Sequence, residues 1–292
     1  MHKLRIGTLV PGNMALKVIP QILPLGFESF GLTFWETIGD INLPQLAQRL
    51  QEILEGHDVV ISSLSVSNNA LVEDNDKAVD DWKQLIDHAH LFGTDLVTGF
   101  AGRVVNEPIE KCIPRFREVF EPLAKRAEDQ GIRLAFENCG MGGNWHRGGW
   151  NIAHGPTAWE MMFDALPAEN IGLEWEPCHQ LVNLIDPVPQ LRKWAHRIFH
   201  VHGKDATIAW DIIREYGING PKAYAWHRTP GFGDSNWTDL ITILRQSNYQ
   251  GTIDIEGFHD PVYRGDLEMT GQVRSLHYLK ECRGGDFVPS PY

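Results

Sequence analysis

The feature of this sequence that most constrains its fold is an alternation, repeated eight times, of a short strand-like run with a longer stretch of helical pattern. The strand-like runs are Leu4–Val10, Glu28–Phe34, Val59–Val66, Leu96–Phe100, Arg133–Cys139, Gly172–Glu176, Ile198–Gly203 and Thr252–Gly257. The helical stretches lie at residues 16–25, 43–55, 76–92, 107–130, 157–166, 186–196, 236–249 and 267–283. Strand–helix units joined by short returns favour parallel strands, and closing them into a barrel leaves no strand edge unpaired.

We therefore expect an α/β fold, a (β/α)8 TIM barrel, as a single catalytic domain over residues 1–284 with an irregular C-terminal tail at 285–292. The chain of 292 residues is long enough for one such barrel with insertions. An open, doubly wound sheet is the alternative. It is disfavoured because no GxGxxG motif follows the first strand.

Residue types at the helix boundaries agree with this division. Four glycines follow helical stretches, where a left-handed residue ends a helix: Gly26, Gly56, Gly93 and Gly131. Four polar residues are the expected N-caps of later helices: Asp76, Thr157, Asp186 and Asn236.

Composition narrows the class of function. The chain has 26 Lys and Arg against 38 Asp and Glu, a formal net charge of −12, which disfavours binding to nucleic acid. No apolar run approaches the ~20 residues of a membrane-spanning helix. The N-terminus carries no signal-peptide pattern, and the four cysteines form no CxxC pair. We expect a cytoplasmic protein with free thiols and with neither a nucleic-acid nor a membrane partner.

Polar residues end the last four barrel strands. With a side-chain period of two, one face of each strand ends at Glu137, Glu176, His202 or Glu256. If these faces point inward, the four side chains converge at the top of the barrel. Three crowded carboxylates would repel one another unless a cation balanced them. Their oxygen-rich set with one imidazole predicts one divalent metal ion, with Mn²⁺ expected and Mg²⁺, Co²⁺, Fe²⁺ or Zn²⁺ as alternatives.

Two long loops follow strands five and seven, Gly140–Pro156 and Ala206–Ser235. Both lie at the carboxyl end of the barrel, where barrel enzymes build their sites. Trp145 offers a flat surface for a sugar, and a histidine with a pKa near neutrality, such as His146 or His227, can act as an acid or a base. Loop packing and solvated histidines are the alternative interpretation of the same residues.

The pattern of Glu137, the run Glu-Pro-Cys-His at 176–179, His-Val-His at 200–202 with a nearby Lys-Asp, and Ile-Glu-Gly at 255–257 resembles the xylose isomerase-like TIM barrels. More narrowly, the chain resembles the sugar phosphate isomerase/epimerase group that includes ketose 3-epimerases and inosose dehydratases. The resemblance spans nearly the whole chain.

This resemblance implies that Glu137, Glu176, His202 and Glu256 bind the metal and that His179 contacts the substrate. The family usually has Asp at the position of Glu176, so Glu174 is the alternative ligand there. Family members often carry an Arg shortly after the strand-seven His; this chain offers Lys204 and, later, Arg228.

A metal ion that chelates a carbonyl and the adjacent hydroxyl stabilises an enediolate, and Glu137 and Glu256 can then remove and return a proton. We expect a metal-dependent sugar isomerase or epimerase acting on a small sugar or keto-sugar. The alternative is a keto-glycoside lyase or a carbon-glycoside deglycosidase subunit, with β-elimination at the same site and a small partner subunit. An endonuclease IV-like nuclease and a non-catalytic sugar-binding barrel fit less well. The sequence leaves open whether the chain forms a homo-oligomer.

Overall fold

Parallel pairing of the first strand with both the second and the last closes the sheet into a ring. The computed structural model describes residues 4–73, 75–285 and 288–291, and within them the barrel order is β1-β10-β7-β6-β5-β4-β3-β2. The barrel strands are β1 Arg5–Pro11, β2 Ser29–Trp35, β3 Val60–Ser67, β4 Leu96–Gly99, β5 Arg133–Glu137, β6 Ile171–Trp175, β7 Ile198–Gly203 and β10 Thr252–Ile255. The predicted TIM barrel is confirmed, with strand bounds close to those expected from the sequence.

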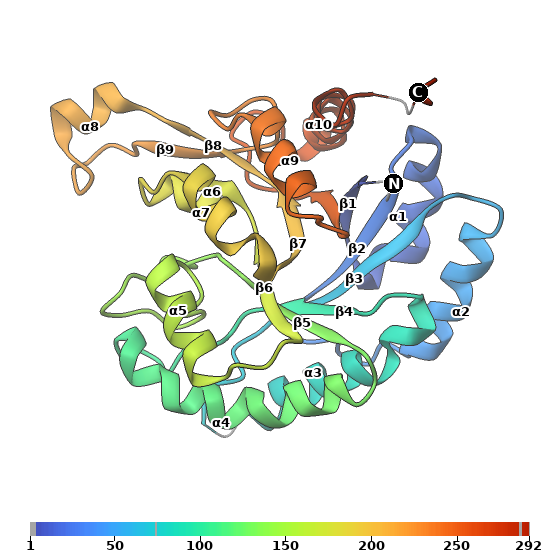
Figure 1. Ribbon diagram of the computed structural model, residues 1–292, viewed down its shortest axis with the longest axis horizontal. Coiled ribbons are helices and arrows are strands. Elements are labelled where there is room, and N and C mark those ends of the chain that lie inside the picture. The colour runs from blue at the N-terminus through green and yellow to red at the C-terminus, as the bar shows by residue number, and fades with distance from the viewer. Residues whose placement is uncertain (1–3, 74, 286–287, 292) are drawn as a thin grey trace.

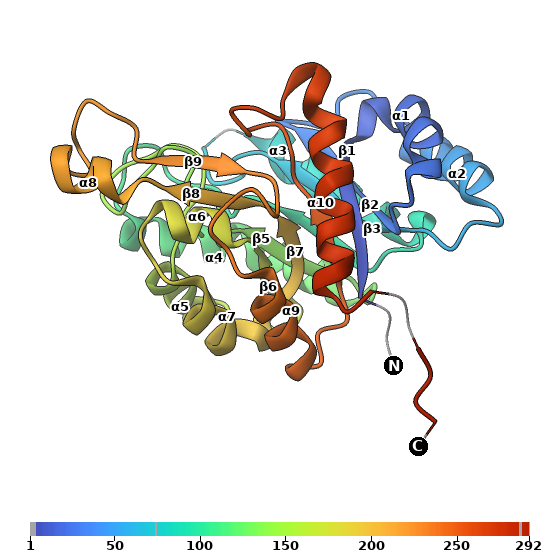
Figure 2. The ribbon, with the colours of Figure 1, turned by 90° about the horizontal axis from the view of Figure 1, so that it is seen from above.

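Helices cover the outside of the barrel (Figure 1; Figure 2). Their bounds are α1 Ala15–Ile22, α2 Leu43–Leu54, α3 Asp76–His88, α4 Ile109–Glu128, α5 Pro156–Ala165, α6 Pro177–Val182, α7 Pro187–Trp194, α8 Trp210–Tyr216, α9 Trp237–Gln246 and α10 Glu268–Cys282. Each long outer helix buries one apolar face; in α4 this face includes Phe116, Phe120 and Leu123. Burial of that face against the strands stabilises the barrel wall.

The glycines predicted to end helices all have left-handed backbone conformations, with φ of 92° at Gly26, 79° at Gly56, 73° at Gly93 and 69° at Gly131. The N-cap predictions are confirmed at Asp186 and Asn236. Those at Asp76 and Thr157 are wrong. The side chain of Asn75 caps α3, and α5 begins at Pro156 after Gly155, so that Thr157 lies inside the helix.

The segment after β7, expected to be a loop, forms an arm. Strand β8 (Asp205–Ile208) pairs antiparallel with β9 (Ala225–Arg228), and α8 lies between them. The arm extends away from the barrel at the left of Figure 1. The pairing was missed because both strands are only four residues long and are separated by residues 209–224, which include α8, instead of by a two-residue turn. The short helix α6, immediately after β6, was missed as well.

At the C-terminus, Gly285 and residues 288–291 of the predicted tail form neither helix nor strand, and Asp286, Phe287 and Tyr292 lie outside the described residues. All four cysteines are free thiols. In the described part of the chain, no helix combines the length and the apolar character needed to cross a membrane.

A candidate metal centre at the mouth of the barrel

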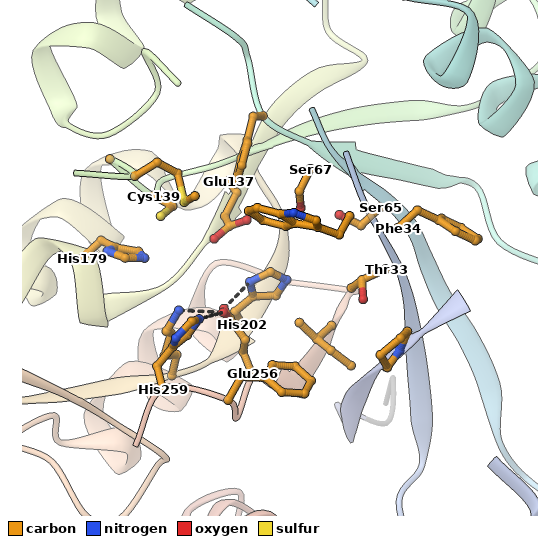
Figure 3. A pocket seen from close by; sticks show the side chains of 18 of the residues that line it. Thr33, Phe34, Ser65, Ser67, Glu137, Cys139, His179, His202, Glu256 and His259 are labelled. Atoms are coloured by element: carbon orange, nitrogen blue, oxygen red, sulfur yellow. Dashed lines mark hydrogen bonds and ion pairs between the residues drawn. The ribbon is translucent and has the colours of Figure 1, made fainter. Parts of the chain in front are cut away.

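Four side chains from four different strand ends meet at the carboxyl end of the barrel. Glu137 ends β5, Glu176 follows β6, His202 lies near the end of β7, and Glu256 follows β10. One potential ligand atom from each lies within 4.8 Å of the other three. Figure 3 shows the Glu137 and Glu256 side chains on either side of His202. The inward orientation that a period of two predicts therefore holds on all four strands.

The position of Glu176 depends on the side chain of Asn138. The amide of Asn138 accepts a hydrogen bond from the backbone N–H of Glu176 at 2.7 Å and donates one to its carbonyl at 2.9 Å. These two bonds continue the pairing of β5 with β6 past the end of the strands. Asn151 fixes Glu137 in a similar way, because its amide donates to the carbonyls of Glu137 and Cys139.

In the protonation state that would bind a metal ion, the cluster carries an excess of negative charge that one dication would balance. Lys204 Nζ lies 2.6 Å from Glu256 Oε1 and 3.9 Å from Glu176 Oε2. With the three carboxylates ionised and His202 neutral, the forms that would bind a cation, these groups and the Lys204 ammonium sum to −2. Burial together with Glu256 raises the pKa of Glu137 well above its usual value. Burial would also raise the pKa of Glu256, but Lys204 and His202 hold it well below the usual range.

Several buried polar atoms of the cluster have no hydrogen-bond partner, which is the observation that tests the fit of a metal. They are Glu176 Oε1 and Oε2, Glu256 Oε2, and both ring nitrogens of His202. Two of these atoms have close contacts that lack hydrogen-bond alignment: Glu176 Oε1 lies 2.8 Å from His179 Nε2, and His202 Nε2 lies 3.0 Å from Glu174 Oε1. His202 Nδ1 lies 3.2 Å from Glu256 Oε2 without hydrogen-bond alignment. An unsatisfied buried polar group costs roughly 1–3 kcal/mol. Oxygen atoms with one imidazole, aimed at a common point, fit a hard divalent cation.

A second polar layer lies beneath the cluster inside the barrel. His200 contacts Glu174 through Nδ1 and Asp254 through Nε2, at 2.7 Å each, and all three are fully buried or nearly so. Burial would lower the pKa of His200, but its hydrogen bonds to the two carboxylates raise it. Glu174 Oε1 also lies 3.0 Å from Nε2 of His202. Glu174 therefore sits below His202, and Glu176 is the residue of this strand that belongs to the four-residue cluster.

A cavity of about 1070 Å³ opens above the cluster. Glu137, His202, Lys204 and Glu256 line one side of it. The opposite side is formed by the ends of β1, β2 and β3 and the segment that follows β2, and Figure 3 shows the hydroxyl-bearing side chains of Thr33, Ser65 and Ser67 there. The cavity thus joins a charged half to a half formed mainly by hydroxyl and apolar groups.

Three of the predicted substrate-binding residues line this cavity: His179, Lys204 and His227. His179 Nε2 lies 2.8 Å from Glu176 Oε1, and its ring packs edge-on against that of His227. Burial, followed by the charge of Lys204, lowers the pKa of His227 to about 4. His227 is therefore neutral at pH 7, which suits a hydrogen-bonding group more than a cation.

The structure does not bring Trp145, His146 or Arg228 to the cavity wall. The carbonyl of Trp145 accepts a hydrogen bond from the buried guanidinium of Arg103, and His146 is exposed on the outer side of the same loop. Arg228 is paired with Asp260 at 2.9 Å.

Sequence reasoning missed several residues of the site. Trp35 and His259 line the cavity, and Asn138 and Asn151 hold the backbone at Glu176 and Glu137. Trp35 is the last residue of β2 and His259 follows β10 by four positions, so the rule that strand ends carry the site could have found both. The two asparagines carry no signal in the sequence, because their role is defined by backbone groups far along the chain.

Comparison with known proteins identifies the family of this barrel. A family model described as "Xylose isomerase-like TIM barrel" matches residues 21–282. An inosose dehydratase of Bacillus anthracis is 24% identical over 251 residues, which cover 80% of each chain. An inosose dehydratase of Clostridium botulinum is 27% identical over 166 residues, 54% of this chain, and the match spans only 51% of that relative's length.

Among solved structures, the apo form of 3-keto-D-glucoside 4-epimerase from E. coli superposes with a TM-score of 0.71 at 14% identity. The match covers 96% of this chain and 100% of the epimerase. At this identity the likeness establishes a common fold.

Proposed function

Because the chain belongs to the xylose isomerase-like TIM barrel family, we propose that it is a divalent-metal-dependent sugar isomerase or epimerase that moves a proton next to a carbonyl group. The observation that carries this proposal is the cluster of Glu137, Glu176, His202 and Glu256, whose ligand atoms lie within 4.8 Å of one another. With the three carboxylates ionised and His202 neutral, as metal binding requires, the buried groups together with Lys204 carry a charge of −2, which matches one dication. Mn²⁺ is the ion we expect.

When bound, the ion would act as a Lewis acid toward the negative charge that develops on the carbonyl oxygen of the substrate. The proton itself is handled by the chain. Glu137 and Glu256 approach the centre from strands on different sides of the barrel, so that one carboxylate can remove the proton and the other can return it. Return to the opposite face gives an epimer, and return to the neighbouring carbon gives an isomer.

The environments of these two glutamates support different roles for them, one as an acid and the other as a base. Burial and the charge of Glu256 raise the pKa of Glu137, whereas Lys204 and His202 outweigh burial and lower that of Glu256. Carboxyl groups whose pKa values are pushed apart can hold one proton between them, as an acid and a base in one reaction require. His179 and His227 line the cavity beside them and can donate or accept hydrogen bonds to substrate hydroxyls.

The proposal is tested by solvent exchange. Candidate keto-sugars are incubated with the Mn²⁺-loaded protein in deuterated water, and deuterium on the carbon next to the carbonyl is measured by NMR. We expect exchange in the wild type and a loss of at least about 100-fold in Glu137→Gln and Glu256→Gln. Glu160→Gln, on the outer face of α5, is the matched control and retains the wild-type rate. Turnover without deuterium incorporation, with shielded internal return excluded, would refute the proposed chemistry.

Metal binding is tested separately. Elemental analysis of purified protein should give about one divalent ion per chain in the wild type and a much lower content in Glu176→Gln and His202→Ala. Unchanged metal content in both variants would contradict the assignment of the centre, whatever the activity.

A second candidate function, elimination by a keto-glycoside lyase or deglycosidase, is favoured by the size of the cavity. About 1070 Å³ leaves room for a leaving group beyond the sugar ring. Elimination begins with the same proton abstraction, so the four-residue cluster serves either outcome. Release of a leaving group from a keto-glycoside would identify a lyase, and a change of configuration alone would identify an epimerase.

A further inference from the structure

The half of the cavity that faces the metal cluster has a different chemistry from the cluster itself. Hydroxyl and apolar side chains line it: Leu9, Thr33, Trp35, Ile38, Ile41, Ser65, Ser67 and Phe100. Asp40 is the acidic side chain of the described lining on this side, and it is exposed. A substrate that reaches from the cluster across the cavity therefore meets charged groups at one end and uncharged groups at the other.

Trp35 gives this half a flat apolar surface. Its side chain lines the cavity, although the residue is 58% exposed. A tryptophan with so much exposed surface has a large apolar area to bury when a ligand binds. The ring is held in place because it packs against Trp150, with ring centroids 5.6 Å apart, and Trp150 meets Phe100 edge-on. The surface is supported before any ligand arrives, which lowers the entropic cost of binding.

The charge of the lining disfavours a phosphorylated substrate. Among the described residues that line the cavity, Lys204 is the one Lys or Arg, and its ammonium already contacts Glu256 at 2.6 Å. Asp40, Glu137 and Glu256 add negative charge. A phosphate dianion needs several cationic or N–H donors, usually arginine in a bidentate arrangement. The wall opposite the cluster supplies no such cation, so an anionic group placed there would be desolvated without compensation.

We infer that the site takes an uncharged keto-sugar linked to a second, flat and apolar ring, with the sugar at the four-residue cluster and the ring against Trp35. This inference rests on the proposed function, which supplies the reacting carbonyl, and goes further in assigning the group attached to the sugar. The size of the cavity, beyond what one sugar ring needs, and the separation of its charged and uncharged halves support the two-part substrate.

Three probes test the inference: 3-keto-glucose, its 6-phosphate ester, and phenyl 3-keto-β-glucoside. Deuterium exchange and phenol release are followed with the Mn²⁺-loaded protein, and kcat/KM is compared among probes in the wild type, Trp35→Ala and Trp35→Phe. We expect kcat/KM for the phenyl glycoside to exceed that for the free sugar by about 10-fold in the wild type. This ratio of kcat/KM values should fall to about one in Trp35→Ala, and Trp35→Phe should restore part of it. The phosphate ester should be the poorest probe. Trp210→Ala, on the exposed arm, is the control.

The outcomes separate the inference from the proposed function. Equal kcat/KM for the free sugar and the phenyl glycoside, with no change of ratio in Trp35→Ala, overturns the inference and leaves the proposed function intact. A preference for the phosphate ester also overturns it. If no probe exchanges, the proposed function fails for these sugars, and calorimetry with phenyl β-glucoside still decides the inference. Binding about 10-fold weaker in Trp35→Ala than in wild type supports the ring site, and equal or absent binding refutes it.

Discussion

One buried ammonium serves two carboxylates of the candidate metal centre: Lys204 Nζ lies 2.6 Å from Glu256 and 3.9 Å from Glu176. Burial would lower the pKa of Lys204, but these carboxylates raise it, so the side chain keeps its charge. Lys204 thereby sets the charge that remains for an ion to balance. Without it, the three carboxylates, in the ionised form that would bind a metal ion, would leave −3 instead of −2.

Lys204→Met should destabilise the metal-free protein more than the metal-loaded protein. Removing one partner of a buried ion pair costs about 3–5 kcal/mol, because the remaining charge is left uncompensated, and a bound dication offsets part of this loss. Urea unfolding with and without Mn²⁺ measures both values. The increase in the free energy of unfolding on adding Mn²⁺ should be larger in Lys204→Met than in the wild type. Lys193→Met, which breaks a surface pair with Glu160, should change neither. An equal gain in all three proteins would contradict the charge balance.

Asn138→Ala should weaken metal binding although Asn138 is no ligand. The substitution removes both hydrogen bonds to the peptide groups of Glu176, so the carboxylate is free to leave its position. Loss of such supporting contacts typically lowers metal affinity by about 10–100-fold. Calorimetric titration with Mn²⁺ measures the effect. Asn170→Ala is matched to it, since Asn170 also makes two hydrogen bonds to backbone groups, in its case the carbonyls of Ala124 and Ile132. Asn170→Ala should lower stability but leave metal affinity near wild type; the same loss of affinity in both variants would argue against positioning.

The contribution of His200 to stability should decline as pH rises. With both ring nitrogens bonded to carboxylates, its pKa is raised in the folded protein, so its stabilising effect is complete below about 6.5, the unfolded value, and is lost through the higher folded pKa. The free energy of unfolding should therefore differ between wild type and His200→Gln by more at pH 6 than at pH 9. Each unit of raised pKa corresponds to about 1.4 kcal/mol. A difference independent of pH would mean that His200 is neutral in the fold.

Arg103→Met should loosen the loop after β5. The buried guanidinium donates to the carbonyls of Glu107, Asn144 and Trp145, at 2.8, 2.7 and 3.2 Å. Methionine fills a similar space but leaves these acceptors without a donor. Trypsin should then cut after the exposed Arg147 several-fold faster, as followed by mass spectrometry. Arg126→Met, which breaks a surface pair with Asp87, serves as the control, and equal cleavage in both variants would exclude an anchoring role for Arg103.

The barrel and the four clustered residues could be predicted because both follow from local periodicity. Each clustered residue stands at or just past the end of a strand, and a period of two decides the face it occupies. Glu174 and Glu176 lie on the same face of their strand. They differ in position along the barrel axis, which places Glu174 in the lower polar layer and Glu176 in the cluster. Height depends on strand register, which one strand's sequence does not define.

The loop residues were harder to place because their orientation depends on distant partners. Trp145 packs against the hydrophobic core instead of the cavity, and its backbone carbonyl is held by Arg103, forty-two positions earlier. Arg228 is held by Asp260, thirty-two positions later. Trp35, which does line the cavity, lies in an unremarkable strand end and owes its orientation to Trp150. Pairings of this kind arise only after the barrel has brought the segments together.

The four proposed ligands lie at the ends of β5, β6, β7 and β10, so no single stretch of the chain would hold an ion in this site alone. Metal binding and closure of the barrel are thus thermodynamically linked, and a tightly bound ion would stabilise the packing of these four strands against one another. If one of these strands separated from its neighbour, the bound ion would be released. The rate of metal transfer to a competing chelator would therefore report partial opening of the barrel under conditions in which the chain as a whole stays folded.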